Sequence, residues 1–257
     1  MLTPGNMSSL ILRNLLKNNK FFDDIRIVET NTLPYGCRKT SSEEIEIHVE
    51  VKKLLAATFP AKGSGDTLKT LKEVYPSVFP VSNVLETTLN NENPVVHPAA
   101  TILNIGRIEH VKGNFYLYKE GISSSVERII DEIDKERLRL CNILGFMEQS
   151  VDKICTEQGY KSTIEQKINA TDALPHCKGP SDKNSRFITE DVPYGLVTWE
   201  SLGRVLEYEM PTTRSIIQFA SVINSIDYFK EGRTVEKLGI SNLSPDEIKK
   251  FLENGYL

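Results

Sequence analysis

The chain has 257 residues, of which 39% are hydrophobic, so it can bury a sizeable core without disulfides or metals to hold it. Its formal net charge of −4 and pI near 5.7 exclude a broad basic surface for nucleic acid or an anionic membrane. With no apolar run approaching about 18 residues and no signal-peptide pattern at the start, we expect a soluble cytoplasmic protein. We expect free thiols and no metal site, because no metal-ligand spacing links the four cysteines, Cys37, Cys141, Cys155 and Cys177.

The first ninety residues predict helices alternating with strands. The segment Ile45–Val51 alternates apolar and polar residues, as a half-buried strand does, and Leu54–Phe59 is expected beside it. The dinucleotide fingerprint G-x-G-x-x-G is absent, and Gly63–Gly65, which lacks the third glycine, predicts a flexible loop. The other expected elements are a helix from Ser8, a strand at Ile25–Thr30 that ends in a turn at Asn31–Gly36, and a helix at Asp66–Tyr75.

The segment that follows contains two prolines four residues apart, Pro94 and Pro98. Because Pro98 has no N–H to donate to the Pro94 carbonyl, we expect a helix here to kink or restart. Asn93 is a suitable N-cap with Pro94 in the first turn. His97 then lies where the hydrogen-bond ladder is broken. From these residues alone, an incidental histidine at a helix start remains an alternative to a functional one.

The second half of the chain is predicted to be helical. Ser124 with Glu127 forms a capping-box pattern, apolar residues recur at three- and four-residue intervals, and Gly145 is a typical helix end, so we expect a helix at Ser124–Leu144. Its charged residues, such as Asp131 with Lys135, are expected on its solvent face. The remaining expected elements are helices at Ser150–Gln158 and Thr163–Asn169, a loop at Asp172–Ser185, and short helices from Trp199 to Leu257, the last capped by Ser244.

A set of short polar motifs runs through nearly the whole chain. The motifs are Glu29–Arg38, Asn83–Thr87, Asn93–Pro98, Phe115–Tyr116 with Glu120–Gly121, Glu190–Leu196, and Glu231–Thr234 with Lys237–Gly239. In this order they resemble the octopine/nopaline (opine) dehydrogenase family. The resemblance implies an α/β fold followed by an all-α one. It implies a partial Rossmann-type sheet domain at 1–90 and, at 91–257, a helical domain resembling the C-terminal domain of 6-phosphogluconate dehydrogenase. Because the family's first strand and glycine-rich turn have no counterpart, we expect a fragment of a longer product or a natural truncation.

The same resemblance implies a reaction. Opine dehydrogenases condense the amino group of an amino acid with an α-keto acid and reduce the imine with NAD(H) or NADP(H). By the family match, His97 is the general acid and base, a task suited to imidazole, whose ordinary pKa is about 6.5. Asp191 matches the carboxylate that fixes the histidine tautomer, and we expect it to face His97 across a cleft.

Four further residues take site roles by the resemblance. Arg186 matches the position that binds a substrate carboxylate, for which guanidinium geometry permits a bidentate bond. Asn93 matches a residue near the nicotinamide, and Thr32 and Cys37 match a loop that lines the amino-acid pocket. A surface salt bridge for Arg186, a helix cap for Asn93 and plain loop structure for Thr32 and Cys37 are the structural alternatives.

Other functions stay open at this stage. The amine could belong to a metallophore precursor, as in opine-metallophore synthases, or the chain could be a cofactor-free small-acid-binding or dimerisation module. A homodimer through the helical half is a further expectation. Arg107 is expected to pair with Glu109 or to reach the cleft, and Trp199 to lie in the core or cleft wall.

Overall fold

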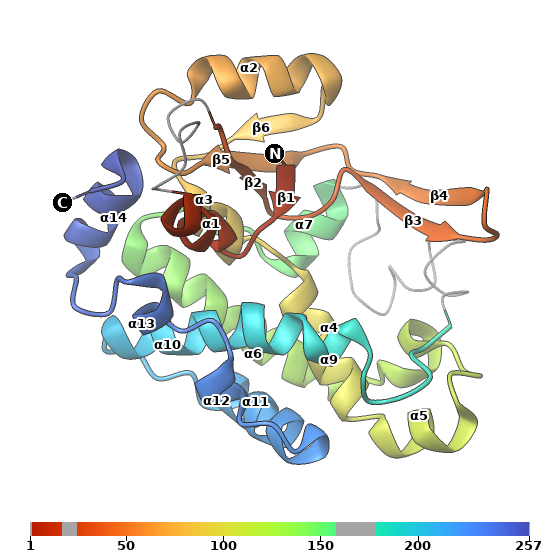
Figure 1. Cartoon of the computed structure of the whole chain (residues 1–257). Helices are drawn as coiled ribbons and strands as arrows, with labels where there is room; N and C mark the ends of the chain where they lie inside the picture. Colours follow the sequence, from red (N-terminus) through yellow and green to blue (C-terminus); the bar gives the residue numbers. More distant parts are fainter. Residues whose placement is uncertain (1, 17–24, 158–177, 257) are drawn as a thin grey trace. The chain divides into compact units, whose positions relative to one another are not determined.

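The computed structural model describes residues 2–16, 25–157 and 178–256, and the chain divides into two compact units (Figure 1). Unit 1 comprises Met1–Asn91 with Leu243–Leu257 and contains both β-sheets, whereas unit 2, Glu92–Asn242, is helical. In the part of the chain that the structure describes, no helix has the length and apolar character needed to span a membrane.

The described part of unit 1 combines six short strands with four helices. The strands are β1 (Leu2–Pro4), β2 (Val28–Thr30), β3 (Tyr35–Lys39), β4 (Ile45–Glu50), β5 (Leu54–Thr58) and β6 (Val78–Pro80), and the helices are α1 (Ser8–Leu16), α2 (Gly65–Val74), α3 (Val84–Leu89) and α14 (Pro245–Asn254). The helix expected from Ser8, the strand near residue 28 and the helix near residues 66–75 are therefore confirmed within a few residues.

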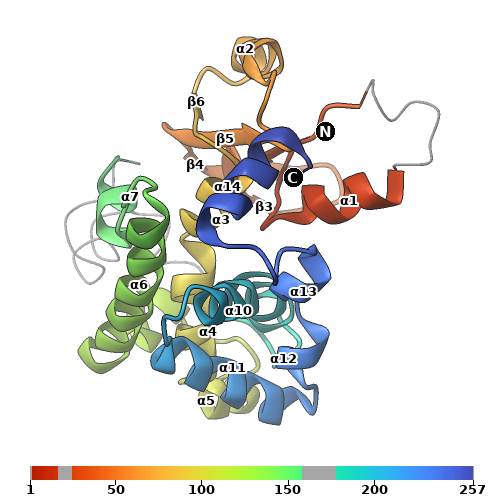
Figure 2. The ribbon, with the colours of Figure 1, turned by 90° about the vertical axis from the view of Figure 1, so that its left-hand side faces the viewer.

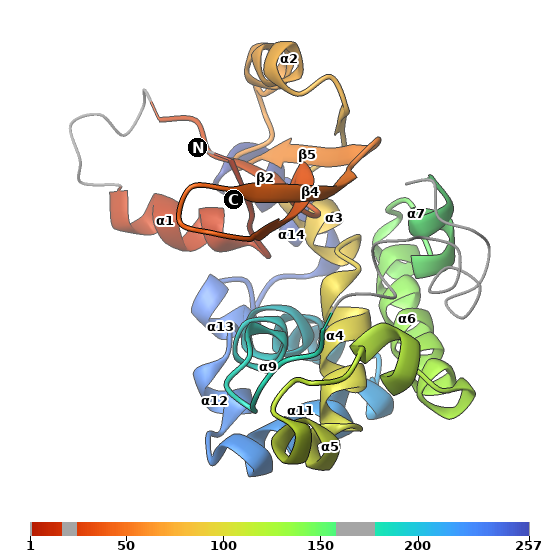
Figure 3. The same cartoon turned by 90° about the vertical axis from the view of Figure 1, so that its right-hand side faces the viewer.

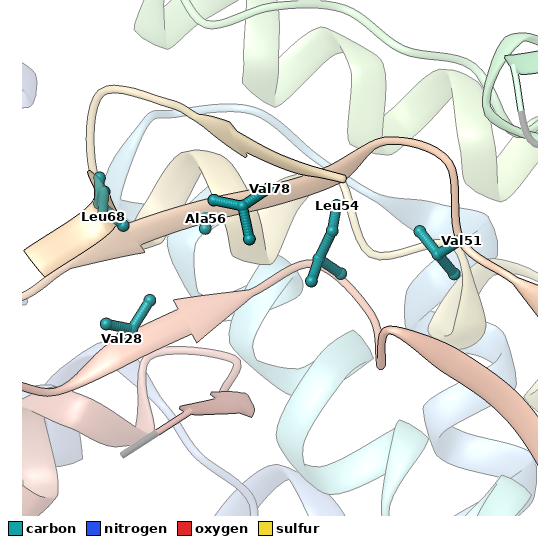
Figure 4. Close-up of a cluster of buried hydrophobic side chains, with 6 residues drawn as sticks. All are labelled: Val28, Val51, Leu54, Ala56, Leu68 and Val78. Atoms are coloured by element: carbon teal, nitrogen blue, oxygen red, sulfur yellow. The ribbon is translucent and has the colours of Figure 1, made fainter. Parts of the chain in front are cut away.

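The main sheet of unit 1 has the strand order β1-β2-β5-β6. The strands β1 and β2 are parallel, β2 and β5 antiparallel, and β5 and β6 parallel. Helix α2 lies on one side of this sheet, with α1 and α3 on the other (Figures 2 and 3). Leu71 and Tyr75 pack against a buried apolar cluster formed by Val28, Val51, Leu54, Ala56, Leu68 and Val78 (Figure 4). Burial of each large side chain of such a cluster contributes roughly 1.5–3 kcal/mol.

The strand expected to be half-buried beside Leu54–Phe59 lies elsewhere. Strand β4 pairs with β3 in a separate two-stranded sheet, and Ile45 and Ile47 are 65% and 55% exposed. The residues Tyr35 and Gly36, which the sequence placed in a turn, begin β3. Strand β5 instead pairs with β2 and β6. A period-two pattern specifies a strand, but it does not specify what covers the apolar face, and here unit 1 leaves that face open.

The C-terminal helix α14 belongs to unit 1, although the sequence analysis assigned 91–257 to the helical domain. Phe251 packs on Phe59 with ring centroids 5.5 Å apart, and the backbone N–H groups of Ala61 and Lys62 donate to carbonyls of α14. The helix begins with the expected cap, because Ser244 and Glu247 form a reciprocal capping box.

The part of unit 2 outside residues 158–177 consists of helices, and the π-helical segments among them are written η. In chain order they are α4 (Asn93–Ile102), α5 (Ile105–Val111), η2 (Leu117–Gly121), α6 (Ser124–Leu144), α7 (Val151–Glu157), α9 (Arg186–Thr189), η3 (Val192–Leu196), α10 (Val197–Val205), α11 (Pro211–Asn224), α12 (Tyr228–Glu231) and α13 (Val235–Leu238). Helix α4 lies at the centre, in contact with α6, α9, α11, η2 and η3 (Figure 3). Trp199 of α10 is fully buried, so its expected place in the core is confirmed.

The long helix α6 confirms the expected bounds and the Gly145 end, where φ is +68°. Two details differ. The cap is Ser123 rather than Ser124, because the Ser123 hydroxyl accepts the Val126 N–H. Asp131 and Lys135 are exposed as expected, yet the other charged residues of α6 are not all on a solvent face, since Asp134, Glu136 and Arg137 are buried.

We expected the helix at Pro98 either to kink or to restart, and the restart does not occur, because α4 continues through Pro98. The N-cap residue is Glu92, and Asn93 is the first residue of the helix rather than its cap. The missing Pro98 N–H is tolerated because the surrounding helices hold α4 on several sides. The helix expected at Thr163–Asn169 lies outside the described residues, as does much of the loop expected at Asp172–Ser185.

Candidate functional site

The candidate site is centred on His97 in helix α4, which is only 7% exposed. Its Nδ1 atom lies 2.9 Å from Asp191 Oδ2, and its Nε2 atom lies 2.9 Å from Tyr118 Oη. Both ring nitrogens therefore have a hydrogen-bond partner. The structure brings together His97 and Asp191, which the sequence paired, and it adds Tyr118, which the sequence analysis did not single out.

Both partners of His97 come from the π-helical segments. Tyr118 lies within η2, and Asp191 immediately precedes η3. Single π-helical turns occur frequently at functional sites, because the wider turn redirects side chains. Segment η3 approaches α4 closely at Gly195, where a side-chain carbon would come within 2.6 Å of Pro94 Cβ. The glycine thus permits the approach that brings Asp191 to His97.

An aromatic ring covers one face of His97. Phe187 of α9 stacks on the imidazole with centroids 4.0 Å apart and planes 20° from parallel. The exposed Arg186 guanidinium lies 5.5 Å from the centroid of the same Phe187 ring. Among the described residues no ion pair of Arg186 occurs, so the salt-bridge alternative has no partner in this part of the chain. The Arg186 guanidinium is therefore separated from the His97 imidazole by one aromatic ring, that of Phe187.

The other expected site residues are distributed over both units. Asn93 is half-buried in the first turn of α4, four residues before His97 and so on the same side of the helix. Thr32 and Cys37 lie in unit 1, where Thr32 is half-buried and Cys37 is an exposed thiol on β3. The positions of Thr32 and Cys37 are described relative to the other residues of unit 1 alone. Arg107 pairs with Glu120 at 2.9 Å, rather than with Glu109.

A further carboxyl group, that of Glu92, belongs to the same neighbourhood. Although the residue is half-buried as a whole, its Oε2 atom is inaccessible and has no hydrogen-bond partner in the described structure. Burial raises the pKa of the Glu92 carboxyl from its ordinary 4.5 to about 7, and the charge of Asp191 adds to this rise. The backbone hydrogen bond at Glu92 and the charge of Arg137 oppose it. Glu92 is therefore a carboxyl that holds a proton near neutral pH.

The sequence offered weak signals for the residues it missed. Tyr118 lies between the motif residues Tyr116 and Glu120, and Phe187 follows Arg186 directly. Glu92 precedes the Asn93–Pro98 motif by one residue, but its burial is a property of the fold. Over the described residues, no cluster of histidine, cysteine and carboxylate groups is arranged to hold a metal ion.

Among the residues of unit 1 that the structure describes, none forms a phosphate-binding turn for a dinucleotide. The turn between β1 and α1 is the nearest equivalent, but the buried Glu29 carboxylate accepts its N–H groups from Met7 at 2.8 Å and Ser9 at 2.6 Å. Donors that bind phosphate at a helix start are thus already paired with a side chain.

Comparison with known proteins gives a consistent picture. A family model described as NAD/NADP octopine/nopaline dehydrogenase, alpha-helical domain, matches residues 80–224. An opine dehydrogenase of Arthrobacter sp. (strain 1C) is 32% identical over 256 residues, which cover 98% of this chain and 71% of the relative. The protein ocs of Agrobacterium tumefaciens (strain Ach5) is 24% identical over 97% of this chain and 69% of its own length.

A solved structure shows the same fold. Octopine dehydrogenase in complex with NADH and agmatine superposes with a TM-score of 0.72 at 18% identity, covering 94% of this chain and 68% of that one. Together with the mixed sheet of unit 1 and the helices of unit 2, this confirms the expected fold class, a partial Rossmann-type α/β part with an all-α part.

Proposed function

Since the chain belongs to the octopine/nopaline dehydrogenase family, we propose that it takes part in the NAD(P)H-dependent reductive condensation of an α-keto acid with the amino group of an amino acid. The observation that carries the proposal is the hydrogen bond between His97 and Asp191, at 2.9 Å, inside two family motifs. Such a pair is suited to the proton transfers that imine formation requires.

In this proposal His97 transfers the proton, and Asp191 holds the imidazole ring of His97 in place. Asp191 accepts the Nδ1–H of His97, so Nε2, which contacts Tyr118 Oη in the structure, is the nitrogen at which His97 takes up and releases the proton. The carboxylate also stabilises the imidazolium while it holds the proton. Burial of His97, at 7% exposure, keeps bulk water from competing for that proton.

The substrates bring carboxylates, and Arg186 is the proposed cation that binds one of them. Its guanidinium is exposed and held over Phe187, whose ring in turn contacts His97. A carboxylate on Arg186 would therefore lie within one ring of the proton-transfer site. Asn93 is proposed to contact the nicotinamide region, and Thr32 and Cys37 to line the amino-acid pocket.

The family's nicotinamide cofactor, when bound, supplies the hydride. The residues described here do not themselves form the phosphate-binding turn, so the roles proposed for this chain are confined to protons and carboxylates. The proposal assigns the reaction to the cytoplasm, where an exposed thiol such as Cys37 stays reduced.

The test is oxidation of NADH or NADPH by the chain with pyruvate, as a simple α-keto acid, and a panel of amino acids. We expect activity to fall about 10²–10⁴-fold in His97→Asn and to fall strongly in Asp191→Asn. His110→Asn is the matched control, because His110 is exposed on α5. If His97→Asn were as active as the parent chain, the role of His97 would be wrong. A panel that includes metallophore-type amines separates the opine-metallophore reading from the amino-acid reading.

A second candidate is a cofactor-free module that binds small acids or dimerises. It is favoured by Glu29, which occupies the N–H groups at the start of α1. It is also favoured by exposed apolar side chains on α11, Phe219 at 55% and Val222 at 67%. Tight binding of NADH or NADPH to the chain, measured by nicotinamide fluorescence, would exclude it. The mass of the chain in solution tests the proposed homodimer.

A further inference from the structure

We propose that a cavity between helices α10 and α11 is a binding site for a free amino acid with an apolar side chain. The cavity has a volume of about 410 Å³, and small-ligand pockets span roughly 300–1,000 Å³. Its walls come from the end of α10, the start of α11 and residues 206–210 between them (Figure 2). The cavity shares no residue with the His97 site, and the inference does not depend on the proposed function.

Two guanidinium groups line the cavity, and one buried carboxylate fixes both of them. The Glu200 side chain is only 5% exposed, its Oε2 atom accepts the Arg204 Nε–H at 3.2 Å, and its Oε1 atom lies 3.6 Å from Arg214 Nη1. The Arg214 guanidinium also lies 5.8 Å from the centroid of the Phe229 ring. The two arginine side chains are themselves 53% and 67% exposed.

This arrangement leaves positive charge and N–H donors for a ligand. In the described part of the chain, Glu200 is the only carboxylate within ion-pair distance of Arg204 or Arg214, so two positive charges share one negative charge. Each guanidinium carries five N–H donors, and Glu200 engages only part of them. The remaining donors suit a carboxylate, which guanidinium groups bind with two parallel hydrogen bonds.

Carboxylates of the opposite charge line the same cavity. Glu207 and Glu209 are exposed, and over the described residues neither side chain takes part in an ion pair or a hydrogen bond. A ligand that carried only a negative charge would be repelled by these two groups, and one that carried only a positive charge would be repelled by the arginines. A free amino acid carries a carboxylate and an ammonium group on one carbon, and therefore matches both.

The rest of the cavity wall is apolar and held in shape. Met210 is 3% exposed, and Pro211 and the half-buried Tyr208 add apolar surface beside it. The Tyr208 N–H donates to the Gly203 carbonyl at 2.8 Å, and a side-chain carbon on Gly203 would come within 2.7 Å of the Tyr208 carbonyl oxygen. The glycine thus lets residues 206–210 fold back on α10. Because the flexible thioether of Met210 adapts to different shapes, we expect an apolar ligand side chain to pack on it.

Titration of the full chain with three related probes tests the site. The probes are L-phenylalanine, 3-phenylpropionate, which lacks the ammonium group, and 2-phenylethylamine, which lacks the carboxylate. The readout is the ¹³C-methyl signal of Met210, assigned with Met210→Leu. We expect L-phenylalanine to shift this signal saturably, and we expect each analogue to bind at least about tenfold more weakly, because each loses charged hydrogen bonds.

Two results of this titration would overturn the proposal. One is a Met210 signal that does not move up to about 10 mM L-phenylalanine, since so weak a site would contribute little binding free energy. The other is an analogue that binds as tightly as L-phenylalanine, because the cavity would then not recognise both charges. The measurement uses neither cofactor nor keto acid, so a chain without reductase activity would refute the proposed function and leave this test intact.

Substitutions of exposed side chains separate the two halves of the site. Arg214→Gln should weaken L-phenylalanine and 3-phenylpropionate at least about tenfold and leave 2-phenylethylamine unchanged, while Arg204 still pairs with Glu200. The double substitution Glu207→Gln with Glu209→Gln should weaken L-phenylalanine and 2-phenylethylamine about threefold and leave 3-phenylpropionate unchanged.

The matched control for these variants is Arg128→Gln, which removes an exposed arginine from α6. We expect it to bind all three probes as the parent chain does. If Arg214→Gln and the double glutamine variant also bound all three probes like the parent chain, the charged groups of the cavity would not hold the ligand, and the proposal would be wrong.

Discussion

Replacing Glu92 by glutamine should change how the stability of the protein depends on pH. The carboxyl of Glu92 has its pKa raised from 4.5 to about 7, chiefly by burial. The folded protein therefore binds this proton more tightly than the unfolded chain between about pH 4.5 and pH 7. The free energy of unfolding falls as pH rises through this interval and levels off above it.

The size of this effect follows from the two pKa values. At about 1.4 kcal/mol for each pKa unit, the interval from 4.5 to about 7 corresponds to about 3 kcal/mol. Part of the residue reaches solvent, so this is the largest effect to be expected. The amide of Glu92→Gln is neutral at every pH and similar in shape. The stability of Glu92→Gln relative to the parent chain should therefore rise by about 2–3 kcal/mol between pH 5 and pH 8.

Urea unfolding at pH 5, 6, 7 and 8 measures the difference directly. The comparison between variant and parent cancels the other groups that titrate in this range. Glu190→Gln is the matched control, because it removes the same charge beside Asp191 from an exposed position. We expect its stability to run parallel to that of the parent. If the Glu92→Gln and parent curves also ran parallel from pH 5 to pH 8, the carboxyl would not be held neutral by burial, and the reasoning would fail.

Three further substitutions test individual packing and capping contacts by urea unfolding, and the His97 ring ¹⁵N shifts are a second readout for two of them. Glu136→Gln should cost about 2–3 kcal/mol, because the buried carboxylate accepts two N–H groups and the Thr213 hydroxyl at the start of α11. Gly195→Ala should cost about 1–3 kcal/mol and perturb the His97 ring ¹⁵N shifts, because the added carbon meets Pro94. Ser244→Ala should cost about 1 kcal/mol, since it removes the capping box of α14, and it should leave the His97 shifts unchanged. A Gly195→Ala chain with unchanged stability, or a Ser244→Ala chain with altered His97 shifts, would contradict these assignments.

Local rules predicted the elements whose signals lie within a few residues of one another. Helix α6 follows from apolar spacing and Gly145, and α14 from its Ser244 cap. Predictions that depend on contacts between residues far apart in the sequence were wrong. The period-two pattern of β4 was correct for a strand, but its neighbour is β3 rather than β5. Pro98 was expected to make a helix kink or restart, yet α4 continues through Pro98 without a restart, held by contacts from the rest of unit 2.

The residues of the candidate site likewise fall into those that the sequence predicted and those that it did not. His97 and Asp191 were paired through family motifs, and the structure brings them to hydrogen-bonding distance. Tyr118 and Phe187 could not be deduced from spacing, because each reaches His97 from a different segment of unit 2. The raised pKa of Glu92 was equally hidden, since it arises from burial and from the charge of Asp191, far along the chain.

The motif that contains His97 and the motif that contains Asp191 contact each other in the fold. Pro94 fits against Gly195, and His97 meets Asp191, so each motif contributes one packing residue and one polar residue. Pro94 and His97 are three residues apart on α4, which places them on neighbouring parts of one helix face. Asp191 immediately precedes η3, and Gly195 lies near the C-terminal end of η3. The glycine and proline therefore set the distance at which the carboxylate reaches the imidazole. In the fold, the residues of the two motifs therefore act together, because the packing residues Pro94 and Gly195 position the polar residues His97 and Asp191.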